Sequence, residues 1–472
     1  MSESGAHILV FPYPAQGHMI PLLDFTHQLA ARGRLTITIL VTPKNLPLLN
    51  PLLAAHPSSI TALVLPFPPH PAVPAGVENT VELPAGGFRS MMCVLAELHN
   101  PILRWFRSHP SPPMAIISDM FLGWTHHLAC QLSIRRYVFC PSGAFAISLV
   151  NSLWVEMPKR KNAGDVNETV SFPKIPHSPV YPWWQLSPIY RSYVDGDPVS
   201  EFVKDSLRAN IASYGLVFNT FRELEGVYLD YLMKELGHNR VWSIGPVSPP
   251  TDVGPAERGG SSSVLINEIC SWLDTCQDHT VVYVCFGSQS VLTNKQMEQL
   301  TLGLEKSGVK FILVIKGATK GHDEGDYGAT PLGFEDRVAG RGVVIKGWAP
   351  QVVILRHRAV RVFLTHCGWN SALESIVAGV PMMAWPMGAD QFVNATLLVD
   401  QLDIAIRVCE GDESVLDSDD LARFLVEATS EKWAERRARA MAMSKAAIDA
   451  IEGGSSFGDL DGFVRHLSKP TK

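Results

Sequence analysis

The sequence predicts an α/β protein made of two doubly wound domains that face each other across a cleft. Three observations predict this architecture. The chain has 472 residues, more than one ordinary domain holds. Short apolar runs alternate with amphipathic stretches in both halves, which indicates parallel strands covered by helices. A segment rich in proline, glycine and serine separates the halves. Ligands of such folds bind at the carboxyl ends of the strands, where the cleft is expected.

Residues 1–246 form the first expected domain. A strand is expected over residues 7–11, a helix over residues 20–32, and a second strand over residues 36–41. Apolar runs of this length, without polar alternation, are typical of strands buried on both faces. Further strands are expected over residues 60–65, 115–118, 136–140 and 215–219, with helical patterns between several of them.

A linker and a second domain follow. Residues 247–263 lack apolar periodicity and have the composition of a linker. Residues 264–454 are expected to form the second domain, because the alternation of strand and helix starts again there. Its strands are expected over residues 281–286, 310–315, 342–346, 360–365 and 381–385, and its helices over residues 294–307, 370–378 and 430–452. Residues 455–472 are expected to carry a C-terminal helix that packs back on the first domain, since glycines end one helix and a serine can cap the next.

Composition and charge narrow the functional classes. Hydrophobic residues make up 46% and charged residues 18% of the chain, which is typical of a globular protein. The net charge of −6 gives no general attraction for nucleic acid or anionic membranes. No apolar run approaches the roughly 20 residues that cross a bilayer. Eight scattered cysteines without a C-x-x-C pair indicate reduced thiols. We therefore expect a monomeric, cytoplasmic protein without a nucleic-acid partner or a membrane span.

Residues 363–374 (FLTHCGWNSALE) have the pattern of a buried strand that turns at Gly368 into a helix. The free N–H groups of such a helix start, together with its dipole, suit a diphosphate. His366, Asn370 and Ser371 add side-chain donors, and Glu374 lies one turn further, where it can accept from two ribose hydroxyls. Helix caps and buried histidines are also common without a ligand, so this segment alone leaves a structural and a functional interpretation equally open.

Two neighbouring segments favour the functional interpretation. Trp348 follows an expected strand, and an indole there can stack on a planar base while the Ala349 backbone pairs with the edge of that base. Asp390 and Gln391 lie in a loop just after another expected strand. A carboxylate and an amide suit the several hydroxyls of a pyranose. The second domain is therefore expected to bind a nucleotide-linked sugar.

Residues 348–391 resemble the 44-residue signature box of the plant family 1 UDP-dependent glycosyltransferases. The box opens with WAPQ, has HCGWNS at its centre and closes with Asp390 and Gln391. The resemblance covers essentially the whole chain, including PYPAQGH at residues 12–18 and FGSQ at residues 286–289. It implies a GT-B fold with two Rossmann-like domains, and an enzyme that transfers a sugar from a UDP-sugar to a small acceptor.

The resemblance also implies which residues contact the UDP-sugar. Base and ribose contacts fall on Trp348, Ala349, Gln351 and Glu374. Diphosphate contacts fall on Ser288, His366, Asn370 and Ser371, at the turn made by Gly368. Sugar contacts fall on Trp369, Asp390 and Gln391, and Ser142 of the first domain is expected to reach the sugar. In this family, a glutamine at the last position of the box, here Gln391, occurs mostly in enzymes that use UDP-glucose. The resemblance therefore favours glucose as the donor sugar.

His18 is the residue expected to act as general base. It follows the first strand at the carboxyl edge of the sheet, and a histidine with a pKa of about 6.5 can take a proton at neutral pH. The imidazolium that forms needs a carboxylate beside it, and Asp119 ends another strand and matches the family's partner aspartate. An isolated histidine at this place is more often a plain helix residue, and the resemblance reverses that preference. We expect one displacement that inverts the anomeric carbon.

The acceptor is expected to be a small phenol such as a flavonoid. Its pocket is expected to be walled by first-domain residues, chosen by their loop positions: Phe88, Phe121, Phe145 and Trp183. Several alternatives stay open. UDP-rhamnose or UDP-xylose can replace UDP-glucose, and the new bond can be made to a ring carbon of the phenol. A nucleotide-sugar epimerase or a non-catalytic UDP-sugar binder would use a similar nucleotide site.

Motifs for metals and cofactors are weak. Three Asp-x-Asp pairs fall in loops or at helix starts, where aspartate caps helices: Asp195 and Asp197, Asp417 and Asp419, Asp459 and Asp461. His126, His127 and Cys130 have helical spacing for a metal but lack a fourth ligand. The glycine motifs of dinucleotide and ATP sites are missing. We expect no metal and no cofactor, with the UDP-sugar as a co-substrate.

Overall fold

The computed structural model describes residues 5–33, 35–83, 87–162, 164–247, 263–317 and 326–468. The expected linker lies outside these described residues except for its two end positions, 247 and 263. The chain divides into two compact units. The first unit holds Met1–Pro250 together with Ala450–Lys472, and the second unit holds Thr251–Asp449. The first unit is therefore made from both ends of the chain.

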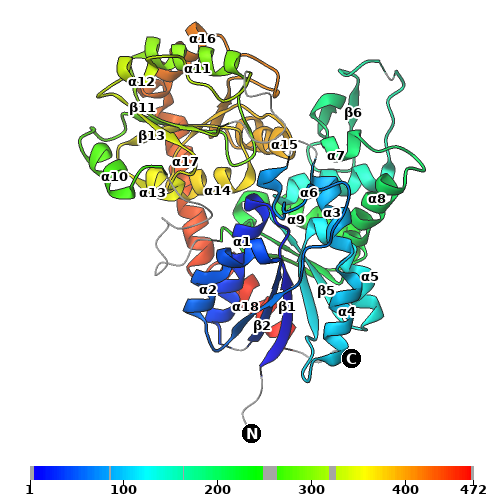
Figure 1. Cartoon of the computed structure of the whole chain (residues 1–472). Helices are drawn as coiled ribbons and strands as arrows, with labels where there is room; N and C mark the ends of the chain where they lie inside the picture. The colour runs from blue at the N-terminus through cyan, green and yellow to red at the C-terminus, as the bar shows by residue number, and fades with distance from the viewer. Residues whose placement is uncertain are drawn as a thin grey trace. The chain divides into compact units, whose positions relative to one another are not determined.

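The first unit contains a sheet of seven parallel strands in the order β3-β2-β1-β4-β5-β8-β9 (Figure 1). The strands are β1 Ala6–Phe11, β2 Leu35–Val41, β3 Ile60–Val64, β4 Ala115–Asp119, β5 Arg135–Cys140, β8 Gly215–Phe218 and β9 Val241–Ser243. Consecutive strands run outwards from β1 to β3, and the order then reverses, so that β1 pairs with β4. Such a reversal opens a crevice at the carboxyl ends of the two central strands.

Helices join the strands of the first unit. They are α1 Gln16–Ala31, α2 Asn50–Ala55, α3 Gly87–Ala96, α4 His99–Ser108, α5 Thr125–Gln131, α6 Ala144–Glu156, α7 Pro188–Arg191, α8 Pro198–Ile211 and α9 Arg222–Leu236. A two-stranded antiparallel hairpin, β6 Thr169–Ser171 and β7 Val180–Pro182, projects from the α6–α7 connection. Parallel strands need such crossovers, and the helices bury the faces of the sheet.

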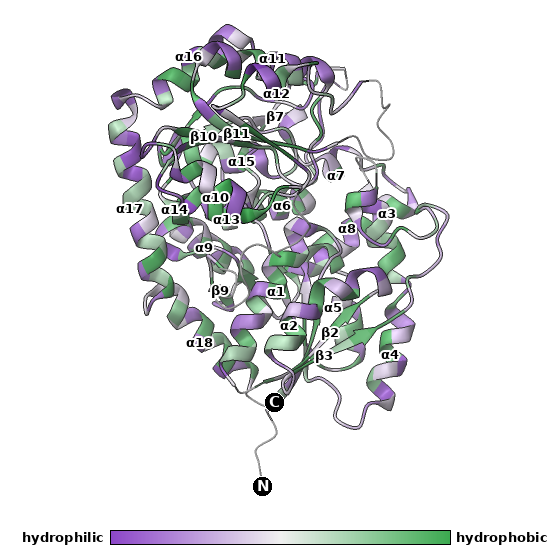
Figure 2. Cartoon of the chain, turned by 60° about the vertical axis from the view of Figure 1, so that its left-hand side comes forward, coloured by the Kyte–Doolittle hydropathy of each residue, from purple (hydrophilic) through white to green (hydrophobic). Residues whose placement is uncertain are grey.

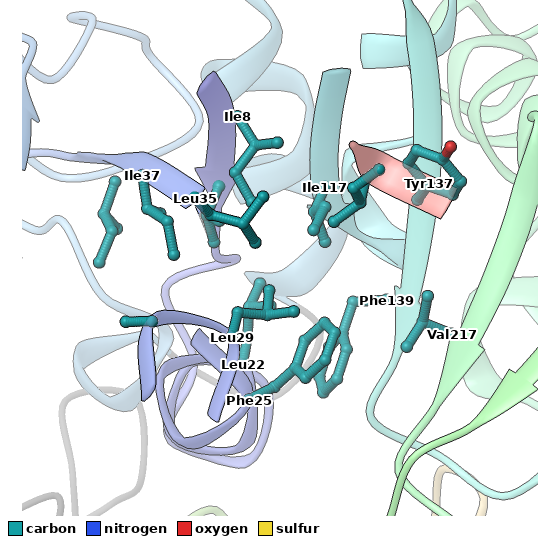
Figure 3. Packing of buried hydrophobic residues seen from close by; sticks show 14 of the residues in the cluster. Ile8, Leu22, Phe25, Leu29, Leu35, Ile37, Ile117, Tyr137, Phe139 and Val217 are labelled. Atoms are coloured by element: carbon teal, nitrogen blue, oxygen red, sulfur yellow. The ribbon is translucent and has the colours of Figure 1, made fainter. Parts of the chain in front are cut away.

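The core of the first unit lies between α1 and the sheet. Figure 3 shows the apolar face of α1 against the strands, with Leu22, Phe25 and Leu29 from the helix. The rings of Phe25 and Phe139 stack with centroids 5.7 Å apart. In β5 every residue except Arg135 is buried, including Arg136, and residues 137–140 of this strand form an apolar run.

The last helix of the chain, α18 Ser455–Leu467, completes this core (Figure 1). Phe463 has no exposed surface, and its ring lies 5.1 Å from that of Tyr137 and 5.0 Å from that of Trp242. Asp459 accepts hydrogen bonds of 2.8 Å from both the N–H and the hydroxyl of Ser243 at the end of β9. The helix is therefore anchored by apolar packing and by a partly buried polar contact.

The second unit contains six parallel strands in the order β12-β11-β10-β13-β14-β15. The strands are β10 Val281–Cys285, β11 Lys310–Ile315, β12 Gly342–Lys346, β13 Val360–Thr365, β14 Met382–Ala384 and β15 Ala405–Arg407. Its helices are α10 Ile266–Asp274, α11 Asn294–Ser307, α12 Phe334–Arg337, α13 Gln351–Arg356, α14 Trp369–Ala378, α15 Gln391–Ala395, α16 Ser418–Ala428 and α17 Ala434–Ile451. Here the order reverses between β10 and β13.

The doubly wound architecture predicted from the sequence is confirmed by these two parallel sheets. Figure 2 shows the strands mainly in the colour of hydrophobic residues, while the outer helices mix both colours. The boundaries differ in places. Helix α1 begins at Gln16 rather than at residue 20, and the helix expected over residues 430–452 is divided into a 3-10 turn, Glu431–Trp433, and α17. No described helix is both long and apolar enough to cross a membrane.

Candidate active site

The reversal in the first unit brings His18 and Asp119 together. β1 ends at Phe11 and leads through a short loop into α1, whose third residue is His18. Asp119 is the last residue of the neighbouring strand β4. The Nδ1 atom of His18 lies 2.9 Å from Oδ2 of Asp119, although the two residues are 101 positions apart.

The hydrogen bonds of Asp119 determine the tautomer of His18. Asp119 is fully buried, and its other carboxylate oxygen accepts a 2.8 Å hydrogen bond from the N–H of Phe121. An ionised carboxylate only accepts, so the proton of the neutral imidazole is on Nδ1. The basic lone pair of His18 is then on Nε2. Because the side chain of His18 is 17% exposed, this nitrogen belongs to a ring that a small molecule can reach.

Aromatic rings surround His18. Phe121 stacks on its imidazole with centroids 4.7 Å apart, and Phe88 lies at 6.2 Å. Tyr13, which the sequence reasoning missed, lies 5.6 Å from His18 and stacks on Phe88. Burial raises the pKa of Tyr13 well above its ordinary value, so its hydroxyl stays protonated, and it donates a 2.8 Å hydrogen bond to the carbonyl of Phe88. These rings form an aromatic cluster around the imidazole.

The other first-unit residues predicted for the site lie elsewhere in the unit. Ser142 follows β5, at the carboxyl edge of the same sheet. Phe145 is 1% exposed and stacks on Tyr228 at 4.3 Å, which makes it a core residue. Trp183 lies in a 3-10 turn, with the guanidinium of Arg160 at 5.0 Å from its ring. Of the four predicted acceptor residues, Phe88 and Phe121 are the two whose rings lie close to the His18 ring in the described part of the first unit.

The predicted diphosphate residues lie where the strand order of the second unit reverses. Ser288 follows β10, and residues 366–371 follow the adjacent strand β13. Gly368 precedes the first residue of α14, so Asn370 and Ser371 lie in the first turn of this ten-residue helix. The first-turn N–H groups of a helix have no partner within the helix. Ser288, Asn370 and Ser371 are thus arranged around the carboxyl ends of two neighbouring strands.

His366 fits between two glycines. A Cβ atom on Gly287 would lie 2.5 Å from its Nε2 atom, and one on Gly368 would lie 2.4 Å away. Burial lowers the pKa of His366 to about 4, so the imidazole is neutral at neutral pH. Its Nδ1 atom is buried and has no hydrogen-bond partner among the described residues. A buried polar atom without a partner is unusual in a folded protein.

A hydrogen-bonded group connects the predicted base and ribose residues. The side-chain amide of Gln351 donates to Ser371 at 3.0 Å and to Glu374 at 2.8 Å. The hydroxyl of Tyr283 donates to the Gln351 carbonyl oxygen at 3.2 Å. Trp348 and Ala349 precede Gln351 on the loop after β12. The segment that carries the predicted base contacts is therefore hydrogen-bonded, through Gln351, to the predicted ribose residue Glu374.

The predicted sugar residues follow β14. The side-chain oxygen of Gln391 accepts from the N–H groups of Met387 at 2.8 Å and Gly388 at 3.0 Å, which leaves donation as the role of its amide nitrogen. Asp390 precedes α15, and Ala389 before it has a left-handed φ of 53°. Trp369 is only 4% exposed, so a sugar contact here would involve its backbone more than its indole.

Comparison with known proteins identifies the family. Residues 260–445 match the family model described as "UDP-glucoronosyl and UDP-glucosyl transferase". UDP-glycosyltransferase 89B2 of Stevia rebaudiana is 59% identical, over 99% of this chain and 98% of the relative. Flavonol 3-O-glucosyltransferase UGT89B1 of Arabidopsis thaliana is 54% identical, over 98% of this chain and 96% of the relative. The chain belongs to the plant family 1 UDP-dependent glycosyltransferases.

Solved structures of this family share the fold. The crystal structure of Arabidopsis thaliana UGT89C1 complexed with UDP-L-rhamnose matches with a TM-score of 0.82 and 38% identity, over 98% of this chain and all of the other. Glycyrrhiza uralensis UGT73P12 matches with a TM-score of 0.84 and 32% identity, over 98% of this chain and 96% of the other. The predicted GT-B fold and the predicted transfer of a sugar from a UDP-sugar are thereby confirmed.

The candidate metal motifs of this glycosyltransferase have structural partners. Asp197 caps α8 and Asp417 caps α16, each accepting from N–H groups of the helix start. His127 pairs with Asp205 on the surface, and Cys130 contacts His126. Within the part of the chain that the structure describes, no group of three or more histidine, cysteine or acidic side chains could hold a metal ion. All eight cysteines are free thiols.

Proposed function

We propose that this glycosyltransferase transfers glucose from UDP-glucose to a hydroxyl group of a flavonol, with His18 as general base and Asp119 as its partner. The observation that carries this proposal is the 2.9 Å bond between His18 and the buried Asp119, beside Phe88 and Phe121. A base beside flat aromatic rings suits a hydroxyl on a flat aromatic molecule.

The relatives support a flavonol acceptor. The 54% identical Arabidopsis relative is named a flavonol 3-O-glucosyltransferase, and a 39% identical one is named a flavonol 7-O-rhamnosyltransferase. The Arabidopsis UGT89C1 structure has also been solved in complex with quercetin, and it matches this chain with a TM-score of 0.79 at 37% identity. The position of the hydroxyl differs between the two named relatives, so the acceptor class is proposed here without its regiochemistry.

The proposed reaction is one displacement. The acceptor hydroxyl gives its proton to Nε2 of His18 while its oxygen bonds to the anomeric carbon, and the bond from that carbon to the β-phosphate oxygen breaks. Asp119 stabilises the imidazolium that forms, and the proton leaves to solvent after UDP departs. The attacking oxygen and the leaving oxygen are on opposite sides of the carbon, so its configuration inverts.

The second unit is proposed to stabilise the leaving UDP. The N–H groups at the start of α14, with Ser288, Asn370 and Ser371, compensate for the charge of the diphosphate. His366 acts there as a neutral hydrogen-bonding group. Trp348 and Ala349 hold the uracil, and Glu374, oriented by Gln351, holds the ribose. Asp390 and Gln391 hold the glucose hydroxyls, with Gly368, Trp369 and Ser142 as further contacts.

Replacing the proposed base tests this function. We expect His18→Ala to lower the rate of transfer to a flavonol at pH 7 by roughly 10²- to 10⁴-fold, which is the usual contribution of a general base. UDP affinity, measured by calorimetry, should not change. His127→Ala is the matched control, because His127 also pairs with an aspartate, at 2.8 Å, but on the surface. If His18→Ala transferred sugar to an ordinary phenol at the original rate, the base assignment would be wrong.

A donor panel separates the alternatives. With one flavonol as acceptor, UDP-glucose should react at least about tenfold faster than UDP-rhamnose or UDP-xylose, since one well-placed hydrogen bond contributes about that factor. Mass spectrometry of the products decides the donor sugar, and resistance to acid hydrolysis would reveal a bond to carbon. UDP-glucose alone should give no new UDP-sugar, whereas an epimerase would produce one.

A further inference from the structure

Arg136 is a buried arginine beside the proposed catalytic pair. It is the second residue of β5, the strand next to β4, and its relative exposure is 1%. Burying a charge is costly unless hydrogen bonds replace its water. A buried guanidinium therefore needs a structural or functional reason, and its contacts show where that reason lies.

The guanidinium of Arg136 holds the end of β4. Its Nε donates to the hydroxyl of Ser118 at 2.9 Å, and one terminal nitrogen donates to the backbone carbonyl of Asp119 at 3.3 Å. The other terminal nitrogen donates at 2.8 Å to Asn210 and at 2.8 Å to Ser213.

Arg136 is also linked to Met120, the residue after Asp119, through the side chain of Asn210. The amide nitrogen of Asn210 donates a 2.8 Å hydrogen bond to the carbonyl of Met120. Arg136 thus fixes three consecutive positions, directly at Ser118 and Asp119 and indirectly at Met120. These positions carry the carboxylate that binds His18 and that accepts from the N–H of Phe121.

The charges around Arg136 are consistent with this role. Burial lowers the pKa of Arg136 to about 9, and the negative charge of Asp119 acts in the opposite direction, as does Cys140. The guanidinium therefore remains protonated at neutral pH. His126 of α5 also faces this charge, and its pKa is lowered first by burial and then by Arg136. Asp119 thus contacts a buried cation through its backbone carbonyl and His18 through its carboxylate.

We propose that Arg136 is a positioning residue of this glycosyltransferase, which acts on the reaction by fixing the Asp119 backbone and thereby the orientation of the His18 imidazole. The inference rests on the proposed function, because it assigns Arg136 a role only through the His18–Asp119 pair. A base displaced by about 1 Å can lose on the order of 10²-fold in rate.

Arg136→Lys tests the proposal, because lysine keeps a long basic side chain and loses the fork of donors. We expect kcat for a flavonol acceptor to fall roughly 10- to 100-fold, while KM and UDP affinity stay within about twofold. The decisive measurement is a double-mutant cycle with Asp119→Ala. Once Asp119 is absent, Arg136→Lys should lower kcat by no more than about twofold, because its effect passes through that carboxylate.

Arg361→Lys is the matched control. Arg361 is likewise buried and likewise donates to backbone carbonyls, those of Ala428 and Ser430, but it lies in the second unit at the start of β13. It should lose stability without a comparable loss of kcat. If Arg136→Lys does not fold, Ser118→Ala removes the Nε contact alone and should lower kcat with the same dependence on Asp119.

The possible outcomes distinguish failure of the proposed base mechanism from failure of the inference about Arg136. Losses that multiply in the double mutant would show that Arg136 acts independently of Asp119, and a loss of the same size in Arg361→Lys would show a general effect of losing a buried arginine. Either result would overturn the inference. If Asp119→Ala itself left kcat unchanged, the proposed base mechanism would fail, and the role of Arg136 with it. If Asp119→Ala abolished transfer while Arg136→Lys and Ser118→Ala were fully active, the mechanism would stand and the inference about Arg136 would fail.

Discussion

At the scale of single residues, two histidine–aspartate pairs have nearly the same N–O distance but differ in burial. His18 and Asp119 lie 2.9 Å apart, and His127 and Asp205 lie 2.8 Å apart. The side chains of the second pair are 54% and 65% exposed, and such an ion pair contributes about 0–1 kcal/mol. Asp119 has no contact with solvent and both of its oxygens have donors. Of these two pairs, the buried one is therefore better suited to hold its imidazole in one tautomer and one orientation.

Burial also predicts how stability depends on pH through His366. Its pKa of about 4 in the folded protein is lower than the value of about 6.5 expected in the unfolded chain. Between these values the unfolded chain binds a proton that the folded protein does not, so stability rises with pH across this window. The contribution of neutral His366 is complete above pH 6.5 and decreases as the pH falls towards 4.

His366→Gln removes this titration. We expect the difference in unfolding free energy between the original protein and the variant to be most favourable to the original above pH 6.5, and to shrink steadily down to pH 4. Urea unfolding at a series of pH values measures this difference. The subtraction cancels the contributions of the other histidines, because both proteins contain them. A difference that is constant with pH would mean that His366 titrates normally in the folded protein.

At the scale of elements, each sheet places its site where the strand order reverses. The ends of β1 and β4 bring together His18 and Asp119, and the ends of β10 and β13 bring together Ser288 and the start of α14. In the second unit, the close approach of the His366 ring to the loop after β10 requires a glycine at position 287. Gly287 has a φ of 76°, and a side chain there would meet the ring of His366.

Gly287→Ala should therefore weaken donor binding. A left-handed alanine costs roughly 1 kcal/mol of stability, and the displaced His366 should in addition raise the dissociation constant of UDP about tenfold. Gly308→Ala is the control, because Gly308 has a similar φ of 67° and nothing within 4 Å of the added Cβ. It should lose similar stability and keep its UDP affinity in calorimetry. Equal UDP affinities of the two variants would contradict the proposed role of His366.

The apolar runs predicted most strands because parallel strands buried on both faces have a nearly unbroken hydrophobic sequence. The hairpin β6–β7 was not predicted, since its strands have only three residues each, are partly exposed and show no period. The start of α1 was placed too late. Pro21 favours the first turn of a helix, but it lies at the sixth position of α1, and Ala15 before the helix makes no side-chain cap.

The site was predicted less completely than the fold. His18 and Asp119 are predicted as a pair through the resemblance to a family, because the pairing of β1 with β4 skips two strands and cannot be read from local patterns. Tyr13 lies within the quoted segment 12–18 but has no chemical signature of its own. Arg136 was not found, since its partners lie between 17 and 77 positions away in the chain.

At the scale of the whole molecule, the first unit depends on the end of the chain. Phe463 of α18 is fully buried against Tyr137 and Trp242. We expect Phe463→Ala to lower the free energy of unfolding of the first unit by roughly 3–5 kcal/mol, the usual cost of removing a buried phenylalanine ring. Phe457 on the same helix is 43% exposed, and Phe457→Ala should cost less than about 1 kcal/mol. Urea unfolding followed by tryptophan fluorescence measures both, and equal effects would contradict the packing described for α18.

The place of α18 has a consequence for synthesis on the ribosome. When residue 250 has been made, the sheet of the first unit is complete, but the helix that covers part of its core begins only at Ser455. The intervening roughly 200 residues take about 10 to 40 s to translate at ordinary rates. During that time the apolar surface around Tyr137 and Trp242 is open to chaperones and to other nascent chains. The second unit, whose residues are contiguous, can fold before the first unit is finished.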